Sequence, residues 1–550
     1  MVTIKTPLIQ LIGEQDENIY QLGLSDRDRH KGLFTQIKSF LTTGVTAIDK
    51  ASEMISIRSV QKTLAENPEY KNILDSYAQG LDIKTEDLAY ALMIPELVSC
   101  MSAWAPGVPS GLLGCSSFFA LEEKTQKPMH ARVLDFPLAG IYDLEERVLR
   151  TNFTGRAQVA SVGSAGLPFG SISGMNSLGT TLALHQKFTG IQEADGTPIF
   201  QIAQEVLETC STAKEVLALL NRKKSITTWA LLMSFAETNE VMELDFMGDI
   251  LSYKIYDLKP GEVLYFSNKV VDENFKQENH APYGIPEYNR YRELNADEKI
   301  KKFNKKGDYS LEAFLRLAST PLKEHHQKEY KKIKESEILD TLTPSSLAIN
   351  VLFPTKQEIL GISTEAPKAF QGSIYRATDL FDDKKASIKE EKIKGKKVSD
   401  TYFKGLRHLI YSQTAYDRHN IHEAYHHIQM AELEFKFGPL HYYTRFFKVV
   451  FDFIHMDHIN LRAQQLNEME SIRSELPEYL QELMTLMIIR TQRLLKEPAT
   501  YSAKDVDHPM LKKIIQLEQK IPALALKNTV WKLINPRIDI SDVLNLGLKN

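Results

Sequence analysis

The spacing of apolar residues along the chain predicts a helical beginning, a strand-rich middle and a helical end. Leu33, Ile37, Phe40 and Leu41 recur at helical spacing and form one apolar stripe. Asn67-Pro68 begins a second helix, with a cap residue followed by proline in the first turn, and Thr85 begins a third. Residues 1–114 are therefore predicted to be a short strand-like piece followed by helices.

Short apolar runs separated by turn residues predict an antiparallel meander over residues 115 to 190, with turns at Gly155 and Gly166. Helical stretches follow over 198–210 and 211–220, and four more strands between 228 and 268. A helix over 308–320 and a closing hairpin over 345–363 complete this part. Several strands are apolar at successive positions, which favours a sheet covered on both faces.

The last part of the chain has few strand signals. Residues 382–399 mix acidic and basic side chains, which predicts a solvated linker. Five stretches between 402 and 495 have helical periodicity. His422 and His426 are four residues apart and could bind a metal, but no HExxH motif surrounds them, and a solvated helical face is the favoured interpretation.

Composition narrows the class of protein. A chain of 550 residues is long enough for two or three domains. A net charge of −4, with no basic run interleaved with aromatics, argues against a general nucleic-acid binder. The three cysteines do not make a disulfide framework, which suits a reducing compartment. No apolar run approaches membrane-spanning length and no signal peptide is recognisable, so we expect a cytoplasmic protein.

The candidate chemistry begins at Gly114-Cys115. The small residue before the cysteine leaves room for a strained peptide bond that the thiol can attack, and a predicted hairpin returns Arg132 and Asp135 toward it. A nucleophilic thiolate needs a nearby cation and an oriented base. Two simpler interpretations stand beside this one: a lone cysteine among apolar residues is commonly inert core, and an Arg–Asp pair on a hairpin is commonly a salt bridge.

Five motifs occur in a fixed order. These are Gly114-Cys115, R-x-x-D at 132–135, G-x-N-x-x-G at 174–179, Ser267-Asn268 at a strand end, and an arginine-rich stretch at 287–292. Their order resembles the N-terminal nucleophile (Ntn) hydrolases, specifically the acyl-CoA:6-aminopenicillanate (isopenicillin N) acyltransferase-like cysteine family. Bile salt hydrolases and acid ceramidase are more distant relatives. The resemblance covers roughly residues 60–370.

The resemblance implies an α+β fold, a four-layer αββα sandwich with an N-terminal helical segment, and the helical periodicity beyond the resemblance adds a C-terminal all-helical domain. The expected domains are a helical pro-segment or small subunit over 1–114, an Ntn-hydrolase core over 115–380, a charged linker over 381–400 and a helical accessory domain over 401–550. The Pro/Gly-rich loop at 104–111 would present the bond to be cut, and the cut pieces would stay associated.

The resemblance also assigns roles. Cys115 would become a nucleophile when the Gly114–Cys115 bond is cut, with its own α-amine as the base. Arg132 would hold the thiolate, and Asp135 would orient the amine. Asn268 would donate to the tetrahedral intermediate, and Arg290 would be a second cation, with Arg292 as the alternative. No metal and no organic cofactor is implied.

The oxyanion donor is less clear from the sequence. Relatives often have an asparagine where this chain has His185 or Gln186, and Asn176 is the asparagine of the G-x-N-x-x-G turn. His130 lies on the same predicted hairpin as Arg132, and we expect it to be a polar packing residue. We therefore predict an Asn176, His185 and Gln186 group that positions the substrate, with Asn176 better suited to fixing its turn.

These features predict a self-processing hydrolase that cleaves a linear amide, or transfers its acyl group, through a thioester. The substrate would be a small-molecule amide or acyl thioester. An alternative is a catalytically idle Ntn-like scaffold whose helical C-terminal part binds a partner protein.

Overall fold

We analysed a computed structural model of the chain. It describes residues 3–41, 46–104, 114–170, 172–275, 285–321, 341–343, 345–394, 400–418, 420–436, 439–455, 458–476, 478–507 and 509–529. The loop at 104–111, expected to present the scissile bond, lies outside these residues from 105 onward.

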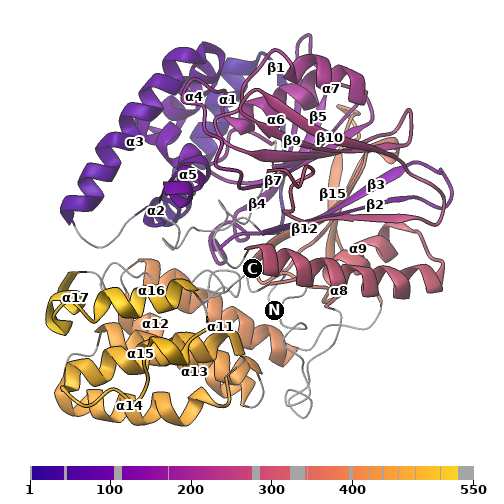
Figure 1. The fold of residues 1–550 in the computed structure, drawn as a ribbon. Helices are drawn as coiled ribbons and strands as arrows, with labels where there is room; N and C mark the ends of the chain where they lie inside the picture. The colour runs from indigo at the N-terminus through magenta and orange to yellow at the C-terminus, as the bar shows by residue number, and fades with distance from the viewer. Residues whose placement is uncertain are drawn as a thin grey trace.

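Two sheets pack face to face at the centre of the fold (Figure 1). Strands β2 and β3 of one sheet contact β7 and β8 of the other. The eight-stranded sheet has the order β1 (Leu8–Gly13), β4 (Glu146–Phe153), β5 (Val159–Ser164), β6 (Ser173–Asn176), β7 (Thr180–Gln186), β8 (Trp229–Phe235), β9 (Glu240–Met247) and β10 (Ile250–Asp257). The seven-stranded sheet has the order β11 (Val263–Phe266), β2 (Gly114–Leu121), β3 (Pro128–Asp135), β12 (Ser346–Phe353), β13 (Glu358–Ile362), β14 (Ser373–Thr378) and β15 (Ser387–Lys392).

Helices cover the outer face of each sheet. Helices α6 (Ile199–Thr209) and α7 (Ala213–Leu220) pack on the eight-stranded sheet, where Val206 lies in one apolar cluster with Leu182 and Leu231. Helices α8 (Ile285–Lys306) and α9 (Leu311–Ser319) pack on the seven-stranded sheet. This is the predicted four-layer αββα sandwich, and the fold class is confirmed.

The N-terminal residues take part in the sandwich. Strand β1 pairs in parallel with β4, whereas every other strand pair in the two sheets is antiparallel. Five helices follow it: α1 (Gln15–Asp26), α2 (His30–Ser39), α3 (Thr46–Glu66), α4 (Pro68–Leu81) and α5 (Thr85–Trp104). Their apolar residues share one buried cluster with β3 and β4, so this segment is packed against the core.

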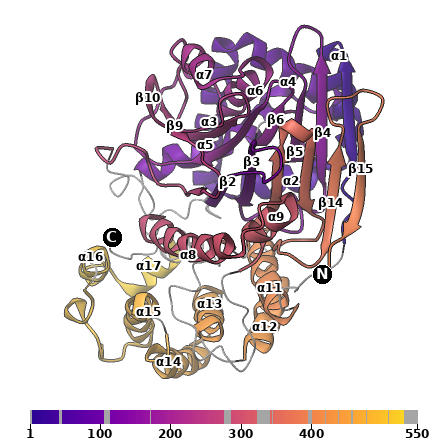
Figure 2. The ribbon, with the colours of Figure 1, turned by 90° about the vertical axis from the view of Figure 1, so that its right-hand side faces the viewer.

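The C-terminal helices extend the core on the side of α9 and the seven-stranded sheet (Figure 2). They are α11 (Asp400–Asp417), α12 (Ile421–Phe435), α13 (Pro439–His455), α14 (Ile459–Arg473), α15 (Glu478–Leu495), α16 (Pro509–Glu518) and α17 (Ala523–Thr529). Their buried residues form one continuous cluster with α9 and with the outer face of the seven-stranded sheet. Among the described residues, no helix is long and apolar enough to cross a membrane.

The prediction of a solvated linker over 381–400 is wrong for its middle part. Residues 387–392 form β15, an edge strand paired with β14. Its side chains, Ser-Ile-Lys-Glu-Glu-Lys, are half-buried or exposed, as suits an edge strand that carries charged residues on both faces. This charged run therefore forms a strand, and the seven-stranded sheet continues beyond residue 380.

A buried ion pair ties the N-terminal helices to the eight-stranded sheet. Arg147 Nη1 on β4 donates to Asp26 Oδ1 on α1 at 2.6 Å, and both side chains are buried. Tyr77 on α4 and the Gly166 N–H donate to the other carboxylate oxygen. The aspartate therefore satisfies groups from three separate parts of the chain.

We predict that Asp26→Ala lowers the free energy of unfolding by about 3–5 kcal/mol, because it leaves the Arg147 guanidinium buried without its counter-charge. Urea unfolding followed by circular dichroism measures this change. The control Lys71→Ala breaks an exposed pair with Asp75 and should cost under about 1 kcal/mol. Equal losses in the two variants would contradict the prediction.

Candidate active site

Cys115 is the second residue of β2, and its side chain points between the two sheets. The residue is 1% exposed. Its Sγ lies 2.8 Å from Nη2 of Arg132 on the neighbouring strand β3 and 3.6 Å from the carbonyl oxygen of Leu184 on the facing strand β7. Arg132 Nη2 also donates to that carbonyl oxygen at 2.7 Å. The sequence-predicted thiol and cation are therefore in direct contact.

Two opposing effects act on the thiol. Burial raises the pKa of Cys115, while the neighbouring Arg132 guanidinium lowers it. Burial is the larger effect, so the thiol of the uncut chain holds its proton more tightly than a free cysteine. Asp135 adds to the rise, which places its carboxylate within electrostatic reach of the sulfur.

The backbone of Cys115 is held as firmly as its side chain. Its N–H donates to Asn268 Oδ1 at 2.9 Å, and its carbonyl oxygen accepts from Arg292 Nη1 at 2.8 Å. Arg292 Nη2 also donates to Asn268 Oδ1 at 2.7 Å. Asn268 thus contacts the nitrogen that would become the α-amine, and its own Nδ2 donates to the Gln186 carbonyl oxygen at 2.9 Å.

The choice of Arg290 as the second cation is wrong, and Arg292, the alternative, occupies the position. Arg290 is exposed and stacks on the ring of Tyr291, 4.2 Å from its centroid. On α8, residues three apart share a face and residues two apart do not. Asn289 therefore lies beside Arg292 and accepts from its Nη2 at 2.6 Å, while Arg290 points away.

Asp135 is near the bond that would be cut. It is paired with Gly114 across β2 and β3, and its Oδ1 accepts from Ser346 Oγ at 2.6 Å. The serine on β12 therefore fixes the carboxylate's orientation. The structure brings Cys115, Arg132, Asp135, Asn268 and Arg292 together around Gly114.

His185 supports Arg132 from the facing sheet. Its Nδ1 lies 3.0 Å from the Ser267 carbonyl oxygen, which can only accept, so we assign the proton to Nδ1. Nε2 then offers its lone pair to Arg132 Nη1 at 3.1 Å. Burial and the Arg132 charge hold the pKa of His185 well below its usual range, in agreement with a neutral ring. This ring accepts from the cation and presents no donor to an oxyanion.

A buried polar chain continues from His185 through three residues. Ser117 Oγ lies 3.0 Å from His185 Nε2 and 3.0 Å from His130 Nε2, and His130 Nδ1 lies 3.1 Å from Thr181 Oγ1. Because His185 Nε2 only accepts, Ser117 donates to it, His130 donates to Ser117, and Thr181 donates to His130. Every member finds a partner with one hydrogen arrangement, so the chain fixes the Arg132 side chain from behind.

Gln186 and Asn176 do not join the site. Gln186 Nε2 donates to the Pro95 carbonyl oxygen of α5 at 2.7 Å, on the opposite face of β7 from His185. Asn176 lies at the far end of β6, where its Oδ1 accepts from the N–H of Leu178 and Thr180 and its Nδ2 donates to Leu207 and Cys210 carbonyls. The predicted oxyanion group of Asn176, His185 and Gln186 is therefore wrong, since strand alternation and the turn separate its members.

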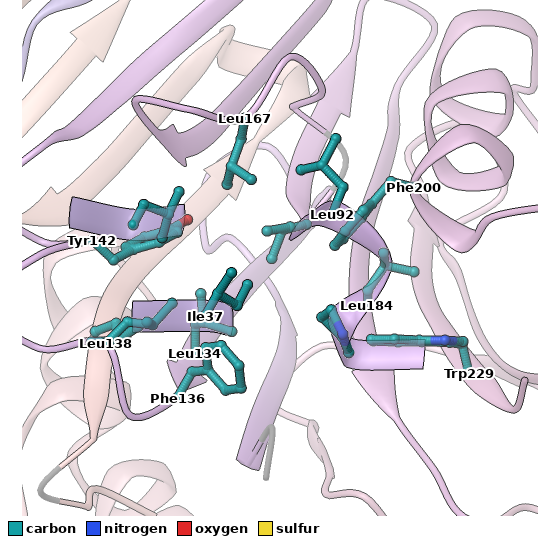
Figure 3. Close-up of a pocket in the computed structure, with 14 residues that line it drawn as sticks. Ile37, Leu92, Leu134, Phe136, Leu138, Tyr142, Leu167, Leu184, Phe200 and Trp229 are labelled. Carbon is teal, nitrogen blue, oxygen red and sulfur yellow. The ribbon is translucent and has the colours of Figure 1, made fainter. Parts of the chain in front are cut away.

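An apolar cavity of about 50 Å³ is lined by two neighbours of Cys115 (Figure 3). Leu134, the cross-strand partner of Cys115, and Leu184, whose carbonyl faces the sulfur, both line it. Its other lining residues come from the N-terminal helices, the turn after β3, and α6 and β8; they are Leu33, Ile37, Leu92, Pro95, Phe136, Leu138, Tyr142, Leu167, Ile172, Phe200, Trp229 and Leu347.

Comparison with known families gives a partial match. Residues 141–347 match the family model described as acyl-coenzyme A:6-aminopenicillanic acid acyl-transferase. The matched range begins after β3 and so contains Asn268 and Arg292 but not Cys115, Arg132 or Asp135.

Solved structures add a distant likeness. One is a Caenorhabditis elegans N-acylethanolamine-hydrolyzing acid amidase (NAAA) ortholog, 14% identical, with a TM-score of 0.31. The match covers 44% of this chain and 93% of that one. No curated protein matches the chain.

Several residues of the candidate site carry no sequence signal of their own. Ser117, Asn289 and Ser346 are ordinary strand or helix residues until the sheets pack. His130 was expected to be a polar packing residue, and its place in the chain behind Arg132 agrees. Only the alternation of polar residues at 115, 117, 130 and 132 could have indicated one polar face between the sheets. Among the described residues, no group of three or more His, Cys, Asp or Glu could hold a metal ion.

A buried carboxyl closes the site on the side of α5. Glu96, next to Pro95, accepts from the Ile199 N–H at the start of α6 at 3.0 Å. Burial raises the pKa of Glu96 to about 8. In the unfolded chain the same group ionises at about 4.3. The folded protein therefore keeps a proton that the unfolded chain loses between these values.

We predict that wild-type stability falls as pH rises from about 4.3 toward 8, with a contribution of up to about 1.4 kcal/mol per pH unit from Glu96. Glu96→Gln cannot ionise, so its pH profile should be flatter and its stability above pH 8 should exceed wild type. Thermal unfolding across this pH range measures both. Asp87→Asn, an exposed change on the same helix, should keep the wild-type slope, and a Glu96→Gln slope equal to wild type would contradict the prediction.

Proposed function

We propose that this protein is a self-processing Ntn amidohydrolase or acyltransferase with Cys115 as its nucleophile. The observation that carries the proposal is the 2.8 Å contact between Arg132 Nη2 and Cys115 Sγ, at a residue whose N–H and C=O are bound by Asn268 and Arg292. A guanidinium beside a thiol stabilises the thiolate, which is the reactive form. No inert core cysteine requires such partners.

Processing begins with the Cys115 thiol attacking the Gly114 carbonyl carbon. The C–N bond breaks, the nitrogen takes up the thiol proton, and Gly114 is held as a thioester on Sγ. Water then attacks the thioester, which releases a Gly114 carboxylate and restores the thiol. Cys115 is now the first residue of a chain with a free α-amine.

Turnover repeats the chemistry on a substrate. The α-amine, with a pKa of about 7.7–8.0, accepts the thiol proton near neutrality. The thiolate attacks the substrate carbonyl, the amine departs with a proton, and the acyl group stays on Sγ as a thioester. Water completes hydrolysis, whereas a second amine completes acyl transfer. Asp135 would orient the new α-amine, and Arg292 with Asn268 Nδ2 would stabilise the oxyanion.

The acyl group would lie in the apolar cavity beside Cys115, because its walls carry almost no polar atoms to bind an amine. The N-terminal helices supply Leu33, Ile37 and Leu92 to that wall. Both pieces of a cut chain would therefore be needed for the substrate site, and the buried cluster they share would keep them together.

An idle scaffold is the second candidate. It is favoured by the burial of Cys115, which is 1% exposed in the uncut chain, and by the missing asparagine at 185 or 186. Such a protein would stay uncut and would form no thioester, and its helical C-terminal part would bind a partner protein.

We predict that intact-mass analysis of the purified wild type finds two pieces, residues 1–114 and 115–550. Cys115→Ala should remain one chain, because it lacks the attacking sulfur. The matched control Cys210→Ala also removes a buried thiol, at the C-terminal end of α6, and should be cut like wild type. A wild-type chain that stays whole while turning over amides would overturn the scheme.

A second prediction separates the two arginines of α8. Arg292→Ala should lower kcat/KM of the cut enzyme on amide substrates by about 100-fold or more, as expected for a lost oxyanion donor. Arg290→Ala removes the same side chain two residues away and should stay within about twofold of wild type, because Arg290 is exposed. Amide hydrolysis per mole of cut chain, with circular dichroism to check folding, makes the comparison. Similar losses in both variants would refute the assignment.

A further inference from the structure

The cavity beside Cys115 has one polar atom that the fold leaves unsatisfied. Of its lining side chains, only Tyr142 and Trp229 carry a nitrogen or oxygen. The Trp229 indole N–H donates to Thr227 Oγ1 at 3.1 Å. The Tyr142 hydroxyl is buried and finds no hydrogen-bond partner among the described residues. Buried hydroxyls are costly to leave unpaired, so a ligand oxygen that reached this one would gain a hydrogen bond.

The hydroxyl is held in place. Tyr142 lies in the turn between β3 and β4, where its N–H donates to the Leu138 carbonyl oxygen at 3.0 Å. The next residue, Asp143, accepts from the Gly140 N–H and the Ala366 N–H, each at 2.7 Å. The tyrosine ring enters the cavity from this turn, on the side away from Trp229 (Figure 3). A side chain anchored in this way can select a ligand by position.

The cavity is lined both by Leu134, the cross-strand partner of Cys115, and by Tyr142. Cys115 and Tyr142 belong to one cluster of buried residues, with Leu134 and Leu138. One buried water occupies about 10–15 Å³ by the same measure, so a cavity of about 50 Å³ has room for a short group of a few heavy atoms. A short acyl group bound to Sγ would extend along the apolar wall to the tyrosine.

We propose that the Tyr142 hydroxyl binds a hydroxyl or carbonyl oxygen carried on the acyl group, so that hydroxyacyl and oxoacyl amides are preferred over plain acyl amides. This inference rests on the proposed function, because it takes the cavity as the acyl site. A tyrosine hydroxyl can donate or accept, so both kinds of oxygen fit it. The rest of the wall is apolar, so the oxygen is favoured at one position of the chain only.

The test uses the cut full-length protein and a set of p-nitroanilides. The set contains hexanoyl anilide and its isomers that carry one hydroxyl at each successive carbon. The corresponding free acids are tested for binding by thermal shift, which needs no catalysis. Tyr142→Phe removes only the hydroxyl. The matched control is Tyr70→Phe, since Tyr70 also has a buried hydroxyl with no described partner but does not line the cavity.

We expect one hydroxy isomer to exceed hexanoyl anilide in kcat/KM by about tenfold, and the same isomer of the acid to bind more tightly. Tyr142→Phe should bring the ratio of hydroxyhexanoyl to hexanoyl kcat/KM to about one, while the control variant should keep the wild-type ratio. A preference that survives Tyr142→Phe, or equal treatment of all isomers in both assays, would overturn the inference. Selective acid binding without any amide hydrolysis would uphold the Tyr142 site and reject the proposed function.

Discussion

The contact between the Arg132 guanidinium and the Cys115 sulfur constrains much of this structure. A guanidinium buried between two sheets needs acceptors on every side. Leu184 supplies a carbonyl and His185 a lone pair, while the Val133 carbonyl accepts from Nη1 at 2.7 Å. The neutral His185 ring then needs Ser117 and His130 behind it. A layer of polar side chains thus lies inside a sandwich whose outer faces are apolar. The need to pair the Arg132 cation explains which residues form this layer.

The strand pattern predicted the strands because they are short, apolar and separated by glycine turns, while the family resemblance supplied their four-layer arrangement. The predicted hairpin placed Arg132 near Cys115, and the resemblance added Asn268; their catalytic roles remain a prediction. The site prediction was wrong where the direction of a side chain depends on its position within a helix or strand. Arg290 and Arg292 are two residues apart on a helix, and His185 and Gln186 are adjacent on a strand. In both pairs the register of packing decided which residue contacts Cys115 or Arg132, and motif spacing leaves this open.

The pattern of charged residues led to another wrong prediction, the solvated linker. Residues 387–392 look like a solvated run because an edge strand has no buried face to fill with apolar residues. The C-terminal helices, predicted to be an accessory domain, share one hydrophobic cluster with α9 and the outer face of the seven-stranded sheet. That cluster depends on which amphipathic faces meet, and periodicity alone does not contain this information. The boundaries of the domains remain a prediction.

Because of strand β1, the cut protein would refold differently from the uncut chain. The strand lies at the edge of the eight-stranded sheet beside β4, although Gly114 separates them along the chain. A cut after Gly114 would make the pairing of β1 with β4 an association between two separate chains. Refolding would then depend on concentration, and a mature enzyme denatured at low concentration would stay inactive while its uncut precursor recovered.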